Sequence, residues 1–121
     1  MIPKKIHYCW FGGNKKSKLI LECIKSWKRH FPDYEIIEWN EGNFDIHQCD
    51  YVEQAYKQKK WAYVSDYARM KILDLYGGIY FDTDVEVIKR FPEELREHSF
   101  SGIEEFSKLV APGLVYGCES G

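Results

Sequence analysis

Along the first forty residues, the spacing of apolar and polar residues predicts a strand, a helix and a second strand. Residues 5–10 are mostly apolar and end at a Phe-Gly-Gly turn, which is typical of a short strand. A helix is predicted between Ser17, a suitable N-cap, and Pro32, which stops it. Its apolar residues recur three or four positions apart: Ile20, Cys23, Ile24, Trp27 and Phe31. Residues 34–39 predict a strand, which completes a β-α-β unit and therefore the start of a parallel sheet.

Two further helices are predicted between residues 50 and 76. Asp50 is followed three residues later by Glu53, as in a capping box, so we expect a helix from Asp50 to about Lys59. The segment from Trp61 to Tyr76 has two apolar stripes, and a helix that is apolar on two sides is expected to be largely buried. The first stripe is Trp61, Val64, Ala68, Ile72 and Leu75, and the second is Tyr63, Tyr67 and Met70.

After residue 76 the pattern is that of extended chain. Gly77 and Gly78 predict a left-handed end to the helix, and residues 79–81 predict a buried strand directly after it. The remaining predictions are extended chain at residues 85–88, a helical turn at 92–97, and two strands at 100–103 and 109–117.

Composition narrows the class of protein. The sequence has 121 residues, of which 45% are hydrophobic and 30% charged, as in a single globular domain. No apolar run approaches the roughly 20 residues that span a bilayer, and the first residues lack the apolar core of a signal peptide. We therefore expect a cytoplasmic location. The four cysteines have neither redox nor zinc-finger spacing, and we expect them to be reduced packing residues.

Charge is distributed unevenly along the chain. The net charge is −2 and there is no recognition motif, so no nucleic-acid partner is expected. Residues 1–30, however, contain eight Lys and Arg residues and one Glu. These cations are either the solvated face of a helix around Lys25, Lys28 and Arg29, or a surface that attracts a phosphate or the inner face of an anionic membrane.

Asp82 and Asp84 follow the predicted strand 79–81 directly. In extended chain, side chains two residues apart point the same way, so both carboxylates can face one cation at the carboxyl end of a strand. Two carboxylates suit Mg²⁺ or Mn²⁺. An Asp-x-Asp pair alone is also common in surface turns, so the motif by itself leaves both interpretations open.

Asp66 and Arg69 lie three residues apart on the doubly apolar helix, within reach of each other. One interpretation is a structural ion pair. The other is a ligand site, in which Asp66 accepts hydrogen bonds from sugar hydroxyls, Arg69 binds anionic oxygen and Ser65 adds a hydroxyl.

Trp10 ends the first predicted strand, beside two glycines. It is either a core residue or an aromatic platform for a nucleobase. His7, on the same strand, is interpreted as a hydrogen-bonded core histidine.

Three blocks of sequence, in this order, resemble the D-x-D sugar transferases of glycosyltransferase family 32. The family includes capsular-polysaccharide enzymes and fungal mannosyltransferases, and large clostridial glucosylating toxins share the blocks. The first block is Ile-Pro-Lys-Lys-Ile-His-Tyr-Cys-Trp-Phe-Gly at residues 2–12. The second is Trp-Ala-Tyr-Val-Ser-Asp-Tyr-Ala-Arg at 61–69, and the third is Tyr-Gly-Gly-Ile-Tyr-Phe-Asp-Thr-Asp-Val at 76–85.

The resemblance implies a fold and a set of site residues. The fold is the GT-A type, a Rossmann-like α/β sandwich that binds a nucleotide-sugar donor through a divalent metal, usually Mn²⁺. Trp10 matches the residue that contacts the base, and Asp66 and Arg69 match the pair that holds the donor sugar. Asp84 matches the metal ligand, while Asp82 matches the carboxylate that contacts ribose or sugar and reaches the metal mainly through water.

The expected function is metal-dependent transfer of a hexose from a nucleoside-diphosphate sugar to a carbohydrate acceptor, with retention of configuration as the resemblance suggests. Because the family's domain is longer, we expect residues 1–121 to be its N-terminal, donor- and metal-binding half. Two alternatives are a non-catalytic nucleotide- or carbohydrate-binding module and a phosphohydrolase with Asp82 as nucleophile. The latter is disfavoured because Glu86 occupies a position where that group has Thr or Val.

Overall fold

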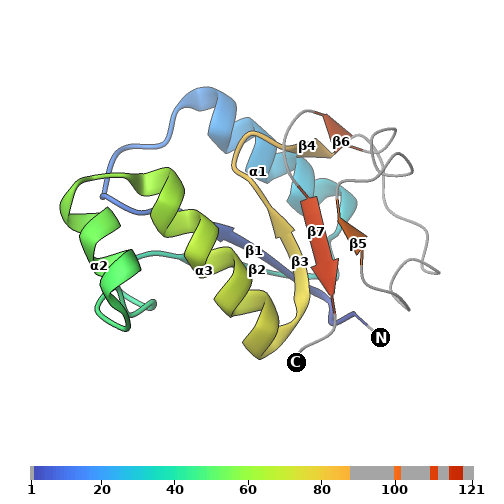
Figure 1. The fold of residues 1–121 in the computed structure, drawn as a ribbon. Helices are drawn as coiled ribbons and strands as arrows, with labels where there is room; N and C mark the ends of the chain where they lie inside the picture. The colour runs from blue at the N-terminus through green and yellow to red at the C-terminus, as the bar shows by residue number, and fades with distance from the viewer. Residues whose placement is uncertain (1, 88–99, 102–109, 112–114, 119–121) are drawn as a thin grey trace.

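The computed structural model describes residues 2–87, 100–101, 110–111 and 115–118. Most of the fold is an α/β sandwich built on one five-stranded sheet (Figure 1). The helical turn predicted at residues 92–97 lies outside the described residues. The elements that carry the site are β1 (Lys5–Cys9), α1 (Lys18–His30), β2 (Glu35–Trp39), α2 (Asp50–Lys57), α3 (Trp61–Tyr76) and β3 (Gly78–Phe81).

The sheet has a parallel half and an antiparallel half. Its order is β2-β1-β3-β7-β5, where β5 is Phe100–Ser101 and β7 is Val115–Cys118. β1 pairs in parallel with β2 and β3, which confirms the β-α-β unit expected from the sequence. β7 runs antiparallel to both β3 and β5.

The strand predicted at residues 109–117 is in fact two strands in two sheets. β6 (Val110–Ala111) pairs with β4 (Glu86–Val87) in a separate two-stranded sheet, while β7 joins the main sheet. The prediction of one strand was wrong because the apolar pattern does not reveal which distant partner each half pairs with.

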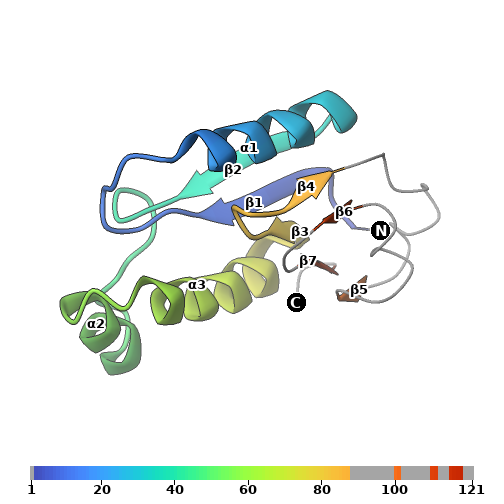
Figure 2. The same ribbon diagram turned by 90° about the horizontal axis from the view of Figure 1, so that it is seen from above.

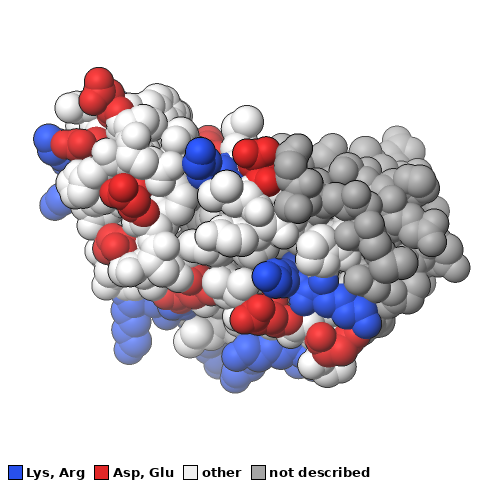
Figure 3. Space-filling view, turned by 90° about the horizontal axis from the view of Figure 1, so that it is seen from below, with Lys and Arg blue, Asp and Glu red and all other residues white. Residues whose placement is uncertain are grey.

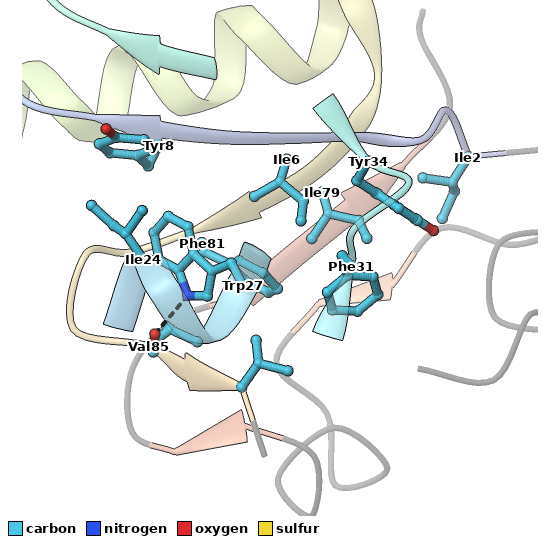
Figure 4. Close-up of a cluster of buried hydrophobic side chains, with 11 residues drawn as sticks. Ile2, Ile6, Tyr8, Ile24, Trp27, Phe31, Tyr34, Ile79, Phe81 and Val85 are labelled. Carbon is cyan, nitrogen blue, oxygen red and sulfur yellow. Dashed lines mark hydrogen bonds between the residues drawn. The ribbon is translucent and has the colours of Figure 1, made fainter. Parts of the chain in front are cut away.

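α1 covers one face of the sheet. Ser17 caps the helix by accepting a hydrogen bond from the Ile20 N–H at 3.2 Å, as predicted. Trp27 is fully buried and its ring lies 5.2 Å from that of Phe81, in the cluster shown in Figure 4. The Trp27 indole N–H donates to the Val85 carbonyl at 2.7 Å, so α1 also holds the chain that follows β3.

α3 covers the opposite face (Figure 2). Val64, Ala68 and Ile72 are buried, as the first apolar stripe predicts, whereas Leu75, the last member of that stripe, is 55% exposed. The prediction of a helix buried on two sides was wrong, because Tyr63 is 51% exposed and Met70 is 71% exposed. The second stripe is therefore only partly buried: Tyr67 packs against the core on this face of the sheet, while Tyr63 and Met70 are exposed.

The links around α2 and α3 differ in part from prediction. α2 begins after Cys49, so Asp50 is its first residue and the predicted capping box was wrong; Glu53 instead forms an ion pair with Lys57 at 3.1 Å. Gly77 ends α3 with φ 66°, which confirms the left-handed end. Gly78 has φ 108°, and a Cβ there would lie 2.8 Å from the Lys5 carbonyl oxygen.

In the part of the chain that the structure describes, no helix is both long and apolar enough to cross a membrane.

Candidate active site

A cleft of about 340 Å³ lies where the carboxyl ends of β1 and β3 meet the first half of α3. This is the edge of an open α/β sheet at which ligands usually bind. Its lining residues are Cys9, Ala62, Ser65, Asp66, Tyr80, Asp82, Thr83 and Asp84. Four of the six residues that the sequence singled out are therefore in one cleft: Ser65, Asp66, Asp82 and Asp84.

The alternation of β3 delivers the acidic pair to this side of the molecule. Ile79 and Phe81 pack with the α1-side core, whereas Tyr80 packs with the α3-side core. Beyond β3 the Val85 N–H donates to the Asp82 carbonyl at 3.0 Å, which closes a turn. Asp82 and Asp84 thus line one cleft as predicted, but a turn brings them there instead of the extended chain that we expected.

Like charges concentrate at Asp82. Burial raises the pKa of its carboxyl, and the negative charge of Asp84 raises it further. Arg69 acts in the opposite direction, Asp66 adds to the rise, and a hydrogen bond with Tyr80 lowers the pKa. The cleft therefore gathers three carboxylates, an arrangement that a bound cation would stabilise.

Asp66 and Arg69 form the intrahelical ion pair that their spacing predicts, with Arg69 Nη2 3.4 Å from Asp66 Oδ1. The Asp66 side chain is 55% exposed and lines the cleft, while the Arg69 side chain is only 15% exposed. The guanidinium carbon of Arg69 also lies 5.8 Å from the centre of the Tyr80 ring, a cation–π distance. Arg69 thus contacts the cleft through two of its lining residues, and the pair has both a structural role and a position at the site.

Trp10 is half-buried and packs against the α1-side core, as the core interpretation expects. Its indole N–H donates to the Asn14 carbonyl at 2.7 Å, and Lys16 Nζ lies 5.6 Å from the ring centre. The cleft lining given by the described residues does not include Trp10. Its contact with a base stays a prediction.

His7 is the core histidine that we expected. It is fully buried; its Nε2 lies 2.8 Å from the Gly77 carbonyl oxygen, and the Trp39 indole N–H donates to its Nδ1 at 3.0 Å. Burial is the largest cause of its lowered pKa.

Cys9 and Tyr80 line the cleft but were not predicted as site residues. Burial raises the pKa of the Cys9 thiol to about 12, so the thiol is protonated and unsuited to act as a nucleophile. Burial also raises the pKa of Tyr80. The sequence signal that could have identified them as site residues is their position on the α3-facing side of β1 and β3.

Asp82 and Asp84 suit a hard divalent cation whose remaining ligands do not come from these two side chains. Within the described residues, no three His, Cys, Asp or Glu side chains come together as a metal site. Asp82 and Asp84 supply two carboxylates to one cleft. Mg²⁺ and Mn²⁺ are commonly held by one or two carboxylates, with phosphate and water oxygens completing the shell.

The basic N-terminal segment is partly neutralised. Three of its lysines form ion pairs, Lys4 with Asp33, Lys16 with Glu38 and Lys25 with Glu22. On the face shown in Figure 3, Lys and Arg side chains lie beside Asp and Glu. These pairs favour the interpretation as a solvated surface, and docking to an anionic membrane stays a prediction.

The fold and the cleft place the protein among the GT-A-like glycosyltransferases. The structure matches that of the PaToxG glycosyltransferase with a TM-score of 0.59 and 26% sequence identity, over 74% of this chain and 45% of that one. Residues 17–101 match the family described as the glycosyltransferase sugar-binding region containing the DXD motif. The chain belongs to this family.

Two relatives are similar in sequence. One is subversion of eukaryotic traffic protein A of Legionella pneumophila, 30% identical over 78% of this chain. The other is the uncharacterized glycosyltransferase L373 of Acanthamoeba polyphaga mimivirus, 34% identical over 70% of this chain. The matched regions cover 19% and 36% of these relatives.

Proposed function

We propose that the protein transfers a hexose from a nucleoside-diphosphate sugar to a carbohydrate acceptor, with Mn²⁺ or Mg²⁺ as cofactor. The observation that carries the proposal is the shared cleft. Asp82 and Asp84 line it from the end of β3, and Ser65 and Asp66 line it from α3. Membership of the glycosyltransferase family supports the same class of reaction.

The acidic pair is the proposed metal site. Asp84 would ligate the cation directly, and Asp82, which is more buried, would act mainly through water and the sugar or ribose. When bound, the cation would neutralise charge that develops on the leaving diphosphate.

The residues of α3 would bind and orient the donor sugar. The exposed carboxylate of Asp66 can accept hydrogen bonds from sugar hydroxyls, and Ser65 can both donate and accept. Arg69 holds Asp66 in place through their ion pair and adds positive charge near the diphosphate. Trp10, directly after the carboxyl end of β1, is the proposed contact for the nucleobase.

The two alternatives are less well supported. In a phosphohydrolase Asp82 would be the nucleophile, but Glu86 occupies the position where that group has Thr or Val. A non-catalytic binding module would use the same cleft, so only turnover separates it from an enzyme.

The test is donor turnover. UDP-glucose, UDP-N-acetylglucosamine and GDP-mannose would each be incubated with the protein and Mn²⁺, and released nucleoside diphosphate would be measured with and without EDTA. We expect release from at least one donor, and its loss in EDTA. Donor binding without release would support the binding module, and neither binding nor release would contradict the proposal.

A further inference from the structure

A second pocket, of about 460 Å³, lies between α2 and the start of α3, and we call it the α2–α3 pocket. Pockets that bind small molecules usually have volumes in the range of about 300–1,000 Å³. Its lining residues are Asp50, Tyr51, Gln54, Ala55, Gln58, Lys60 and Tyr63. None of them lines the cleft, so this is a separate site.

The walls of the α2–α3 pocket combine flat rings with planar polar groups. Tyr51 is 55% exposed and Tyr63 is 51% exposed, a large exposure for two aromatic side chains in one pocket. Gln54 and Gln58 add amides that both donate and accept hydrogen bonds. A pyranose has an apolar C–H face and a rim of hydroxyls, so rings and amides together match both parts of a sugar.

Charge favours a neutral ligand. Asp50 and Lys60 contribute one charge of each sign to the α2–α3 pocket. A site for phosphate or an anionic lipid headgroup would concentrate positive charge instead.

Local sequence explains how the α2–α3 pocket forms. Tyr51 and Gln54 lie three residues apart and so share one face of α2, and Gln58, four residues further on, caps the end of the helix on that face. Lys59 takes a left-handed φ of 57°, which turns the chain tightly into α3. Ala55, which is buried, gives the pocket a small floor residue.

Contacts from neighbouring side chains hold the two rings. The Tyr51 ring lies 6.3 Å from that of Tyr67, and Lys60 Nζ lies 5.6 Å from the centre of the Tyr63 ring. Rings that are already positioned lose less conformational entropy when a ligand stacks on them.

The α2–α3 pocket and the cleft share the first two turns of α3. Ala62, Ser65 and Asp66 line the cleft, while Tyr63 lines the pocket. The two sites are therefore neighbours on the same two turns of α3, an arrangement that fits one oligosaccharide occupying both.

We propose that the α2–α3 pocket is an acceptor subsite, which binds hexose units of an oligosaccharide whose reacting end lies at the cleft. This inference rests on the proposed glycosyltransferase function. It assigns part of acceptor recognition to α2 and to the first residues of α3, the helix that also lines the cleft.

The test measures oligosaccharide binding with matched variants. Cellotetraose, maltotetraose and mannotetraose would be titrated separately into ¹⁵N-labelled protein, and chemical-shift changes of backbone amides in α2 and α3 would be followed. We expect at least one sugar to bind. Tyr51→Ala and Tyr63→Ala should each weaken that binding about fivefold or more, as expected for loss of an aromatic contact.

Three control variants isolate the ring contribution. Tyr51→Phe and Tyr63→Phe keep the ring and should retain most of the affinity. Met70→Ala changes an even more exposed side chain on α3, outside both sites, and should have no effect. The inference is overturned if none of the three sugars shifts these amides at millimolar concentration, or if the alanine variants bind as well as the wild type.

A donor-release assay on the same variants separates this inference from the proposed function. Tyr51→Ala and Tyr63→Ala should leave Mn²⁺-dependent release of nucleoside diphosphate to water unchanged. Loss of sugar binding with normal donor release would support the subsite. Sugar binding in a protein that releases no diphosphate would contradict the enzyme while the pocket stands as a sugar-binding site.

Discussion

The two faces of the sheet are packed by similar means and used differently. On the α1 face, large side chains such as Trp27, Phe31 and Phe81 are almost completely buried, and the Trp27 N–H is satisfied by a backbone carbonyl. On the α3 face, the core includes Cys9 and Tyr80 near the ends of β1 and β3, and these two residues also line the cleft. There the chain places carboxylates around a cleft of about 340 Å³.

The difference shows how one strand serves both purposes. In β3, Ile79 and Phe81 complete the α1-side core, Tyr80 faces α3, and Asp82 follows at the strand end. Both faces therefore contribute a buried cluster to stability, but only the α3 face also carries the cleft, so substitutions can separate stability from ligand binding.

The largest effect on stability is expected at the α1 face. Trp27→Ala removes a fully buried side chain and should lower the free energy of unfolding by about 3–5 kcal/mol, measured by urea denaturation. Should that variant not fold, Trp27→Phe keeps an aromatic ring and loses the N–H bond to Val85 and a smaller volume, so its loss of stability should be smaller. A Trp27→Ala protein as stable as the wild type would contradict the account of this face.

At the cleft on the α3 face, we expect a substitution to reduce activity without lowering stability. Asp84→Asn removes a proposed metal ligand and should reduce donor turnover about 100-fold or more, since a group that stabilises transition-state charge is lost. Asp84 is exposed and repels Asp82, so the unfolding free energy should not fall. Asp74→Asn, an exposed substitution on α3, is the control and should change neither quantity.

His7 should give the α3 face a pH dependence. The buried ring accepts a hydrogen bond from Trp39 at Nδ1, so it must stay neutral, and its pKa is below 6.5. Below pH 6.5 the unfolded chain binds the extra proton and the folded chain does not, so stability is complete above that pH and falls as the pH decreases.

The free energy of unfolding should change with pH by up to about 1.4 kcal/mol per pH unit for one proton. It would be measured by urea denaturation at several pH values. His7→Gln retains a donor and an acceptor but does not titrate, and this part of the slope should disappear. An unchanged slope in His7→Gln would assign it to other groups.

The smallest effect is expected at the turn between α2 and α3. Lys59 has a φ of 57°, where a side chain is strained, so Lys59→Gly should raise the unfolding free energy by up to about 1 kcal/mol. Lys71→Gly, the same change in the interior of α3, should lower it by about 1 kcal/mol. Equal losses in both variants would show that the turn is not strained.

Local patterns predicted the elements that local physics determines. The stripe from Ile20 to Phe31 defines α1, and Gly77 is glycine because φ is positive there. The sequence pattern does not indicate which distant strand a segment pairs with. Residues 109–117 were therefore predicted as one strand, although the described parts of this segment belong to two sheets.

The site was predicted in a similar, partial way. The D-x-D at a strand end and the resemblance to known transferases led to Asp66, Asp82 and Asp84, which do share a cleft. Helical periodicity wrongly predicted that Tyr63 and Met70 are buried, because an apolar stripe does not show whether a neighbouring element covers it. The α2–α3 pocket depends on Lys59 adopting a conformation that its residue type does not favour.

The most direct test of the central claim is calorimetric titration of UDP and of GDP into the protein in the presence of Mn²⁺. We predict binding of at least one nucleotide that requires Mn²⁺ and is lost in Asp84→Ala, with Asp74→Ala as an unaffected control. No binding of either nucleotide, or equal binding by wild type and Asp84→Ala, would contradict the account.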